Sequence, residues 1–177
     1  AAVSRTFSLT SLGTQQGAFL TYPPSKMPDG YDPRARPWYK NAVAAANTTI
    51  TEPYMDMVTN TLVVSIMAPV YRDKVLIGVG GGDLSLDALV KIVNSLNLGG
   101  LGYAFLVSGD GKILVSPDKD QVTKNLSDVY PNQTPVINDR FNETKLSGSD
   151  RIIRFIKIQG LPSVDWYIGL SIDKDKA

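Results

Sequence analysis

The strongest constraint on the fold is that the chain runs twice through one order of elements. In each half a candidate hairpin ends at a proline, Pro23 in the first and Pro117 in the second. Each half closes with a strand that reads Ile-Gly-aliphatic and then reaches an aspartate, over residues 77–83 and 168–173. Self-similarity on this scale indicates an approximate internal duplication. We therefore predict two small modules of one architecture rather than one continuous sheet.

The first half is predicted to be rich in strands around one short helix. Residues 3–22 read as a hairpin with a turn at Gly13–Gly17. Proline, aspartate and glycine punctuate residues 23–36, which favours a loop, and the alanine-rich run 38–47 favours a helix. Further strands are expected over residues 49–58, 61–71 and 75–80.

A helix is predicted between the halves, and the second half then repeats the pattern of the first. Apolar residues recur at helical spacing within 84–96, namely Leu86, Leu89, Val90, Val93 and Leu96. Residues 102–117 read as a second hairpin around a Gly-Asp-Gly turn. The polar stretch 118–144 has no clear pattern, and strands follow over 151–158 and 166–172.

These elements predict an α+β fold with antiparallel sheets. The first module is expected over residues 1–82 and the second over 99–177, with the connecting helix in 83–98. With 43% hydrophobic residues, the chain has enough apolar side chains to bury a core in each.

The residues that the chain lacks exclude several classes of function. It has no cysteine and no histidine, which removes disulfides, the usual zinc sites and histidine-based catalytic dyads. A net charge of +1 is far from the basic excess typical of nucleic-acid binders. No apolar run approaches the roughly 20 residues of a membrane span, and no signal peptide is evident. We expect no enzyme activity, no cofactor, no metal site and no nucleic-acid partner.

The stretch GYDPRARPWYK, residues 30–40, carries the first candidate site. Proline is preorganised for the first helical turn, so Pro37 predicts a helix start and holds the preceding Arg36 extended. Arg36 then projects beside a helix N-terminus, where backbone N–H groups and the helix dipole already favour an anion. A guanidinium binds a carboxylate or phosphate through two hydrogen bonds. Trp38 can add an indole N–H, and Tyr31 and Tyr39 can add hydroxyls and ring faces.

A structural role is the alternative for this stretch. Arg36 would then pair with Asp32 or Asp56, and the aromatic side chains would pack the core, as in most ion pairs and aromatic clusters.

A second group of residues can hold a cation. Tyr54 and Asp56 are two apart on a predicted strand and so point to one face. Asp83 follows three glycines at a predicted corner between strand and helix. Together the two carboxylates can bind an ammonium, with tyrosine faces adding cation–π attraction. The alternatives are that Asp83 caps the helix and that the glycines mark a bulge.

A guanidinium and two carboxylates on neighbouring elements suit a small zwitterion, whereas the aspartates would repel a phosphate. A glycosidase that uses Asp56 and Asp83 as paired carboxylates is the enzymatic alternative. The subsite for a ligand side chain is expected from residues 15–22 and from Met55 or Met57.

The motifs YDPRARPWYKNA, TEPYMD, GVGGGDLSLDAL and GYAFLVSGDGKILVSP resemble the extracytoplasmic double-Cache sensor domains of bacterial chemoreceptors. The resemblance runs from about Thr6 to the end of the chain and is strongest in the first module. It points to the subset that binds free L-amino acids. The resemblance implies these ligand-binding residues: Tyr31, Arg36, Trp38, Tyr39, Tyr54, Asp56 and Asp83.

The resemblance also implies roles and an architecture. Arg36 and Trp38 would hold the ligand carboxylate, and the tyrosines and aspartates would surround its ammonium. Two PAS-like modules would stack along a long N-terminal helix, with the ligand in the membrane-distal module, here 1–82, and 99–177 proximal to the membrane. That helix, which carries much of the dimer interface, is expected to lie outside this chain.

The implied protein is a periplasmic sensor domain of a membrane-anchored, homodimeric chemoreceptor. Because the same module also occurs on histidine kinases and cyclic-dinucleotide enzymes, a sensor of that kind for another amine or a carboxylate is the alternative.

Overall fold

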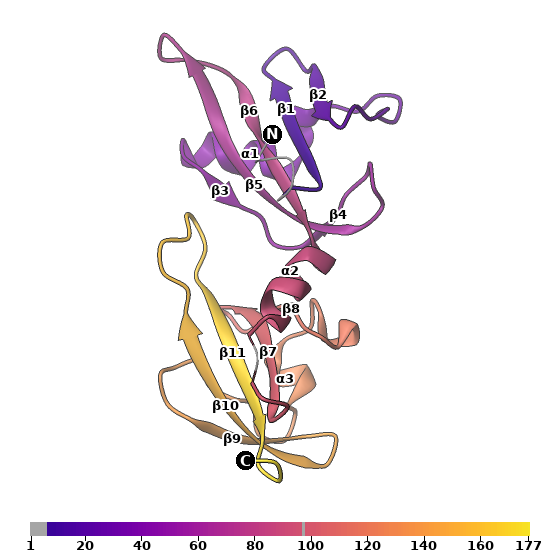
Figure 1. Ribbon diagram of the computed structural model, residues 1–177. Helices are drawn as coiled ribbons and strands as arrows, with labels where there is room; N and C mark the ends of the chain where they lie inside the picture. The colour runs from indigo at the N-terminus through magenta and orange to yellow at the C-terminus, as the bar shows by residue number, and fades with distance from the viewer. Residues whose placement is uncertain (1–6, 97) are drawn as a thin grey trace. The chain divides into compact units, whose positions relative to one another are not determined.

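The computed structural model describes residues 7–96 and 98–177. The chain divides into two compact units, Ala1–Leu86 and Asp87–Ala177, and each contains its own antiparallel sheet (Figure 1). The predicted α+β class with two sheets is thereby confirmed. Within the described ranges, no helix has the length and apolar character needed to cross a lipid bilayer.

The first unit is a sheet with one helix across it. Its strands are β1 (Leu9–Thr14), β2 (Phe19–Tyr22), β3 (Thr49–Ile50), β4 (Tyr54–Met55), β5 (Leu62–Arg72) and β6 (Val75–Ser85). They run in the order β2-β1-β6-β5-β3, and β4 pairs with β5. The short helix η2 (Pro33–Ala35) leads into α1 (Pro37–Ala45), which covers one face of this sheet (Figure 1). The core between them contains Trp38, Tyr39, Ala42, Met67 and Val79.

Two predicted elements of the first unit differ in the structure. The strand predicted over 49–58 is two short strands, β3 and β4, because Pro53 cannot donate to a ladder between them. The strand predicted to end at Gly80 continues to Ser85. Glycine makes this continuation possible, since a Cβ on Gly81 would lie 2.0 Å from the Ile66 carbonyl oxygen of β5. The start of the predicted hairpin, residues 3–6, lies outside the described residues.

The second unit repeats the topology of the first. It contains α2 (Leu86–Asn94), β7 (Gly102–Ser108), β8 (Ile113–Val115), η3 (Lys119–Gln121), α3 (Leu126–Val129), β9 (Asn142–Leu146), β10 (Ser149–Lys157) and β11 (Trp166–Asp173). The strand order is β8-β7-β11-β10-β9, which matches the first sheet position by position. The predicted duplication is therefore confirmed at the level of sheet topology.

Element bounds in the second unit differ modestly from prediction. The helix predicted over 84–96 spans Leu86–Asn94, because the preceding residues belong to β6. Strand β9 begins inside the stretch 118–144, where no pattern was evident, and ends two residues beyond it. It is a polar strand with one buried residue, Thr144, and it joins β10 through a tight turn with positive φ at Ser147 and Gly148.

Candidate functional site

The start of α1 has the geometry that the sequence predicted. Arg36 is extended, with φ −78° and ψ 146°, and Pro37 is the first helical residue. The Arg36 side chain is half-buried and lines a cleft of about 240 Å³ with Tyr31 and Met57. An anion in this cleft would meet the guanidinium and the positive end of the helix dipole together.

Asp32 and Asp56, the two carboxylates that the sequence suggested as partners of Arg36, are bound to other groups. Asp32 pairs with Arg34 at 2.8 Å and also accepts the Arg34 backbone N–H at 2.9 Å. Asp56 caps its own turn, where its Oδ2 accepts the Thr59 backbone N–H at 2.7 Å and hydroxyl at 2.8 Å. Because neither carboxylate is bound to it, the Arg36 guanidinium is available to an anion in the cleft.

Asp83 is a strand residue rather than a helix cap, so the N-cap alternative is wrong. It lies on β6 opposite Ser65 of β5, and its side chain is buried, with the residue 4% exposed. The Ser65 hydroxyl donates to Asp83 Oδ1 at 2.5 Å, and the Tyr54 hydroxyl lies 2.7 Å from Ser65 Oγ. Since the Ser65 proton is directed at Asp83, Tyr54 donates to Ser65. Ser65 therefore completes a chain Tyr54–Ser65–Asp83, which sequence reasoning missed.

The Asp83 carboxyl is held in an unfavourable place for its charge. Burial raises the pKa of Asp83 to about 6, the hydrogen bond from Ser65 lowers it in part, and the negative charge of Asp56 raises it further. Burial also raises the pKa of Tyr54 strongly, and the charge of Asp83 adds to that shift. A cation placed beside Asp83 would relieve this electrostatic cost.

Tyr31 connects the cationic and the anionic side of the site. Burial raises the pKa of its hydroxyl, and the Arg36 charge opposes that shift. The charges of Asp56 and Asp83 act in the same direction as burial, so both carboxylates also lie within electrostatic reach of this hydroxyl. Tyr31 thus has a cation and two anions around it, which is the charge pattern that complements a zwitterion.

Trp38 is a buried aromatic side chain that belongs to the same ring cluster as Tyr31, through Phe19. Its ring centroid lies 5.8 Å from that of Phe19, which in turn lies 5.0 Å from that of Tyr31. A hydrogen bond from the Trp38 side chain also lowers the pKa of Tyr31. Gly13 of β1 makes room for this ring, since a Cβ there would lie 2.9 Å from Trp38 Cη2.

Tyr39 is placed differently from the other predicted residues. It is buried in the core, with its ring centroid 5.7 Å from that of Trp38. Its hydroxyl has no hydrogen-bond partner among the described residues. Burial raises the pKa of Tyr39, and the charges that modulate it belong to Arg34 and Asp32. Of the predicted residues, only Tyr31 and Arg36 line the cleft. The others act on the Tyr31 hydroxyl by charge or hydrogen bond, or have it among their own electrostatic neighbours: Trp38, Tyr54, Asp56 and Asp83. Tyr39 lies in the core beside Trp38.

Comparison with known proteins supplies the family. The family model described as Cache domain matches residues 3–177. The chain is 56% identical over 172 residues to the methyl-accepting chemotaxis protein PctB of Pseudomonas aeruginosa, which covers 97% of this chain and 27% of PctB. It is 53% identical over 176 residues to McpG of Pseudomonas putida, which covers 99% of this chain and 28% of McpG. The chain thus spans about a quarter of the length of these curated relatives.

Solved structures agree with these relatives. The ligand-binding domain of PctB from P. aeruginosa PAO1 in complex with L-Arg matches with a TM-score of 0.94 at 54% identity, over 99% of this chain and 75% of that chain. The ligand-binding domain of the Pseudomonas fluorescens chemoreceptor CtaA in complex with L-alanine matches with a TM-score of 0.92 at 50% identity, over 99% of this chain and 76% of that chain. With a family match over nearly its whole length, this chain belongs to the Cache domain family.

Proposed function

We propose that this chain is the amino-acid-binding sensor domain of a chemoreceptor, and that its first unit binds one free L-amino acid without turning it over. The observation that carries the proposal is the pattern of charge around Tyr31, with the Arg36 guanidinium on one side and the buried Asp83 carboxylate on the other. The resemblance to solved domains that hold L-Arg and L-alanine supports it.

The carboxylate end of the ligand is assigned to Arg36. Its guanidinium lines the cleft beside the start of α1, and a carboxylate there can accept two parallel hydrogen bonds from it. Trp38 forms a buried wall and Tyr31 supplies a hydroxyl at the same place. Met57 lines the cleft and is half exposed, so it is assigned to the subsite for the ligand side chain.

The ammonium end is assigned to Asp83. Its Oδ1 is oriented by Ser65, which Tyr54 supports in turn. An ammonium at this point would keep Asp83 ionised and satisfy it by charge-assisted hydrogen bonds. Asp56 adds negative charge nearby while its turn stays closed by its own hydrogen bonds. Tyr39 is assigned a supporting role behind Trp38.

The wider setting follows the relatives. Both curated relatives reported above are methyl-accepting chemotaxis proteins, which favours a chemoreceptor output over the kinase or cyclic-dinucleotide enzyme that the sequence left open. We propose a periplasmic location, membrane anchoring by other parts of a longer protein, and a homodimeric receptor. Ligand binding would signal through its differential affinity for two arrangements of the receptor.

A thermal-shift screen tests the proposed function. The domain is melted with each of the twenty L-amino acids, with their decarboxylated amines and with their deaminated acids. Some of the intact zwitterions are expected to stabilise it saturably, by about 2.7 kcal/mol at a concentration 100 times the dissociation constant. For a chain of this size that corresponds to a shift of roughly 5–10 °C.

Each other outcome of the screen favours a named alternative. Stabilisation by amines or by acids alone, with no preference for the zwitterion, would replace the proposal with a sensor for that compound class. Disappearance of the ligand during incubation would indicate an enzyme. If all compounds leave the melting temperature unchanged while the domain stays folded, the proposed function is wrong.

Two conservative tyrosine variants separate a ligand-binding hydroxyl from a packing one. Tyr54→Phe removes the hydroxyl that donates to Ser65, whose own hydroxyl donates to the Asp83 carboxylate. Because a hydrogen bond that supports a charged group contributes about 1.5 kcal/mol, the substitution is expected to weaken amino-acid binding about tenfold. Tyr39→Phe removes a buried hydroxyl without a partner among the described residues, so affinity is expected to stay within about twofold of wild type. Isothermal titration calorimetry measures both. Equal effects of the two substitutions would contradict the assignment.

A further inference from the structure

The turn that joins β4 to β5 binds Asp56 by one of its two carboxylate oxygens. Asp56 Oδ2 accepts the backbone N–H of Val58 at 3.2 Å, the backbone N–H of Thr59 at 2.7 Å and the Thr59 hydroxyl at 2.8 Å. Among the described residues, these donors are all directed at Oδ2, and none is directed at Oδ1. Because Asp56 is only 8% exposed, its Oδ1 is a buried acceptor that needs a partner from outside the turn.

The main chain of this turn is closed without the Thr59 side chain. The Asp56 backbone N–H donates to the Thr61 carbonyl at 2.9 Å, and the Asp56 carbonyl accepts the Asn60 backbone N–H at 3.0 Å. Asn60 adopts the positive φ, 52°, at which the chain turns back toward β5. Thr59 is exposed, and its hydroxyl contacts the Asp56 carboxylate and the Thr61 hydroxyl. A change of the Thr59 side chain therefore acts on the Asp56 carboxylate and leaves the turn in place.

The charge of Asp56 reaches the groups that surround the proposed position of the ammonium. Burial is the main cause that raises the pKa of Asp83, and the negative charge of Asp56 raises it further. Burial is also the main cause that raises the pKa values of Tyr31 and Tyr54, and the charge of Asp56 again adds to it. Asp56 therefore lies within electrostatic reach of a cation bound at Asp83.

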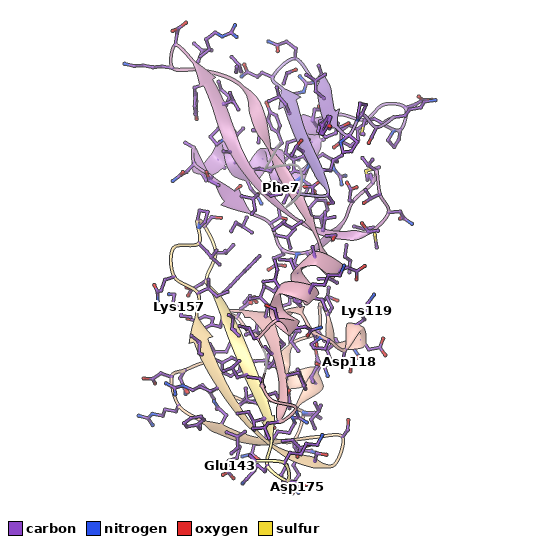
Figure 2. The ribbon with its side chains drawn as sticks, in the orientation of Figure 1. Phe7, Asp118, Lys119, Glu143, Lys157 and Asp175 are labelled. Carbon is purple, nitrogen blue, oxygen red and sulfur yellow. The ribbon has the colours of Figure 1, made fainter. Side chains whose placement is uncertain are left out.

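Asp83 itself points to the face of the first sheet that α1 covers. Alternate residues of a strand share a face, and Val79, four residues before Asp83 on β6, packs in the core with α1. Gly82 faces the other side of the sheet, where a Cβ would lie 2.5 Å from the Phe7 ring (Figure 2). An ammonium bound at Asp83 is therefore on the α1 face, and Asp56 reaches it from the turn after β4.

We propose that Thr59 is a positioning residue of the ammonium site: its hydroxyl and backbone N–H hold Asp56 Oδ2, so that Oδ1 is turned toward an ammonium bound at Asp83. This inference rests on the proposed function, because it requires an ammonium as ligand. Thr59 does not touch the ligand. The χ2 torsion of an aspartate is broad, so binding one carboxylate oxygen is what gives the other a fixed direction. The Thr61 hydroxyl lies 2.8 Å from that of Thr59 and donates to it, since the Thr59 proton is directed at Asp56.

The substitution Thr59→Val tests this proposal, because valine keeps the branched shape and the backbone N–H but has no hydroxyl. Affinity for the best amino acid from the screen is expected to fall about tenfold, the effect of losing one hydrogen bond to a charged group. The decarboxylated amine, which keeps the ammonium, is expected to lose the same factor. Thr59→Ser retains a hydroxyl and is expected to bind within about threefold of wild type. Since Thr59 is exposed, both variants are expected to melt within about 2 °C of wild type without ligand.

Two further comparisons separate positioning of the carboxylate from a general effect on the turn. Thr61→Val is the matched control: it removes a hydroxyl of the same turn that is one hydrogen bond further from Asp56, and affinity is expected to stay within about twofold of wild type. In an Asp56→Asn background the charge that Thr59 orients is gone. Thr59→Val is then expected to cost no more than about twofold in addition.

Four results would overturn the proposal. These are wild-type affinity in Thr59→Val, a loss for the amino acid that is absent for the amine, an equal loss in Thr61→Val, and an undiminished effect of Thr59→Val on top of Asp56→Asn. Each of them leaves binding by wild type unchanged, so the proposed function is judged separately, by the screen of the wild-type domain.

Discussion

Replacing Asp83 with asparagine is expected to abolish the response to amino acids and to make the ligand-free domain more stable at neutral pH. The loss of binding follows because the ammonium loses its buried counter-charge, which costs about 2–5 kcal/mol, or roughly 30-fold or more in affinity. The asparagine keeps an oxygen that can accept from Ser65, so the local hydrogen bonding is retained. Calorimetry with the best ligand from the screen measures the first effect.

The gain in stability has an electrostatic origin. In the folded domain without ligand, burial raises the pKa of Asp83 from its ordinary 3.8 to about 6. Two pKa units correspond to about 3 kcal/mol of unfavourable free energy for the ionised, folded form at pH 7.5. Asparagine carries no charge to bury, so its ligand-free melting temperature is expected to rise by up to about 6–12 °C.

The difference in melting temperature between Asp83→Asn and wild type is expected to depend on pH. Because the pKa of Asp83 is raised by folding, its contribution to stability is greatest at low pH and is lost as the pH rises from about 4 to about 6. The gap in melting temperature between Asp83→Asn and wild type should therefore open over that window and stay constant above it. In wild type, affinity for an amino acid should fall as Asp83 becomes protonated below about pH 6.

A matched control isolates the buried site. Asp87→Asn makes the same chemical change at an exposed carboxylate, which pairs with Lys119 at 3.3 Å with both side chains 73% exposed. It is expected to leave affinity unchanged and to shift the melting temperature little. A destabilised Asp83→Asn that still binds the ligand with wild-type affinity would contradict both the ammonium assignment and its electrostatic basis.

The parts of the site that depend on local sequence were predictable. The conformation of Arg36 follows from the proline after it, and the start of α1 follows from the same proline. The pairing of Asp32 with Arg34 is also local, since Asp32 is the N-cap of η2 and its carboxylate accepts from the Arg34 backbone and side chain. From the sequence, Asp32 was a candidate partner of Arg36 instead, because this short helix was not predicted.

The parts that depend on tertiary pairing were not predictable from local pattern. Three glycines and an aspartate before a helical repeat predicted a corner between strand and helix. Asp83 is a strand residue because β6 pairs with β1 on one side and with β5 on the other. Ser65 gave no signal, since one serine in an apolar strand is ordinary. Its role arises from the register that places it opposite Asp83. The duplication was visible in the sequence, but the matching order of the strands in the two sheets became evident only in the structure.

Arg36→Ala is expected to remove the preference of the domain for amino acids over the corresponding amines. Arg36 lines the cleft at the start of α1. The two acidic residues that the sequence suggested as its partners are bound elsewhere, Asp32 to Arg34 and Asp56 to the turn at Thr59. A ligand carboxylate would therefore be its partner. Losing a bidentate charge-assisted contact in a partly buried site costs about 2–3 kcal/mol, or roughly 30–150-fold in affinity.

The measurement compares the affinities of wild type and Arg36→Ala for two ligands that differ only in the carboxylate. Wild type and Arg36→Ala are titrated with the best amino acid and with its decarboxylated amine. The amine, which has no carboxylate, should bind both proteins equally, because its ammonium contacts remain with Asp83. Arg34→Ala is the matched control: it removes an arginine two positions away whose side chain is exposed and already paired with Asp32, so it should change neither titration by more than about twofold. Equal weakening of the amine and the amino acid by Arg36→Ala would contradict the assignment. Arg36 would then support the fold of the cleft rather than bind the carboxylate. The zwitterion site would have to be replaced by a simple amine site around Asp83.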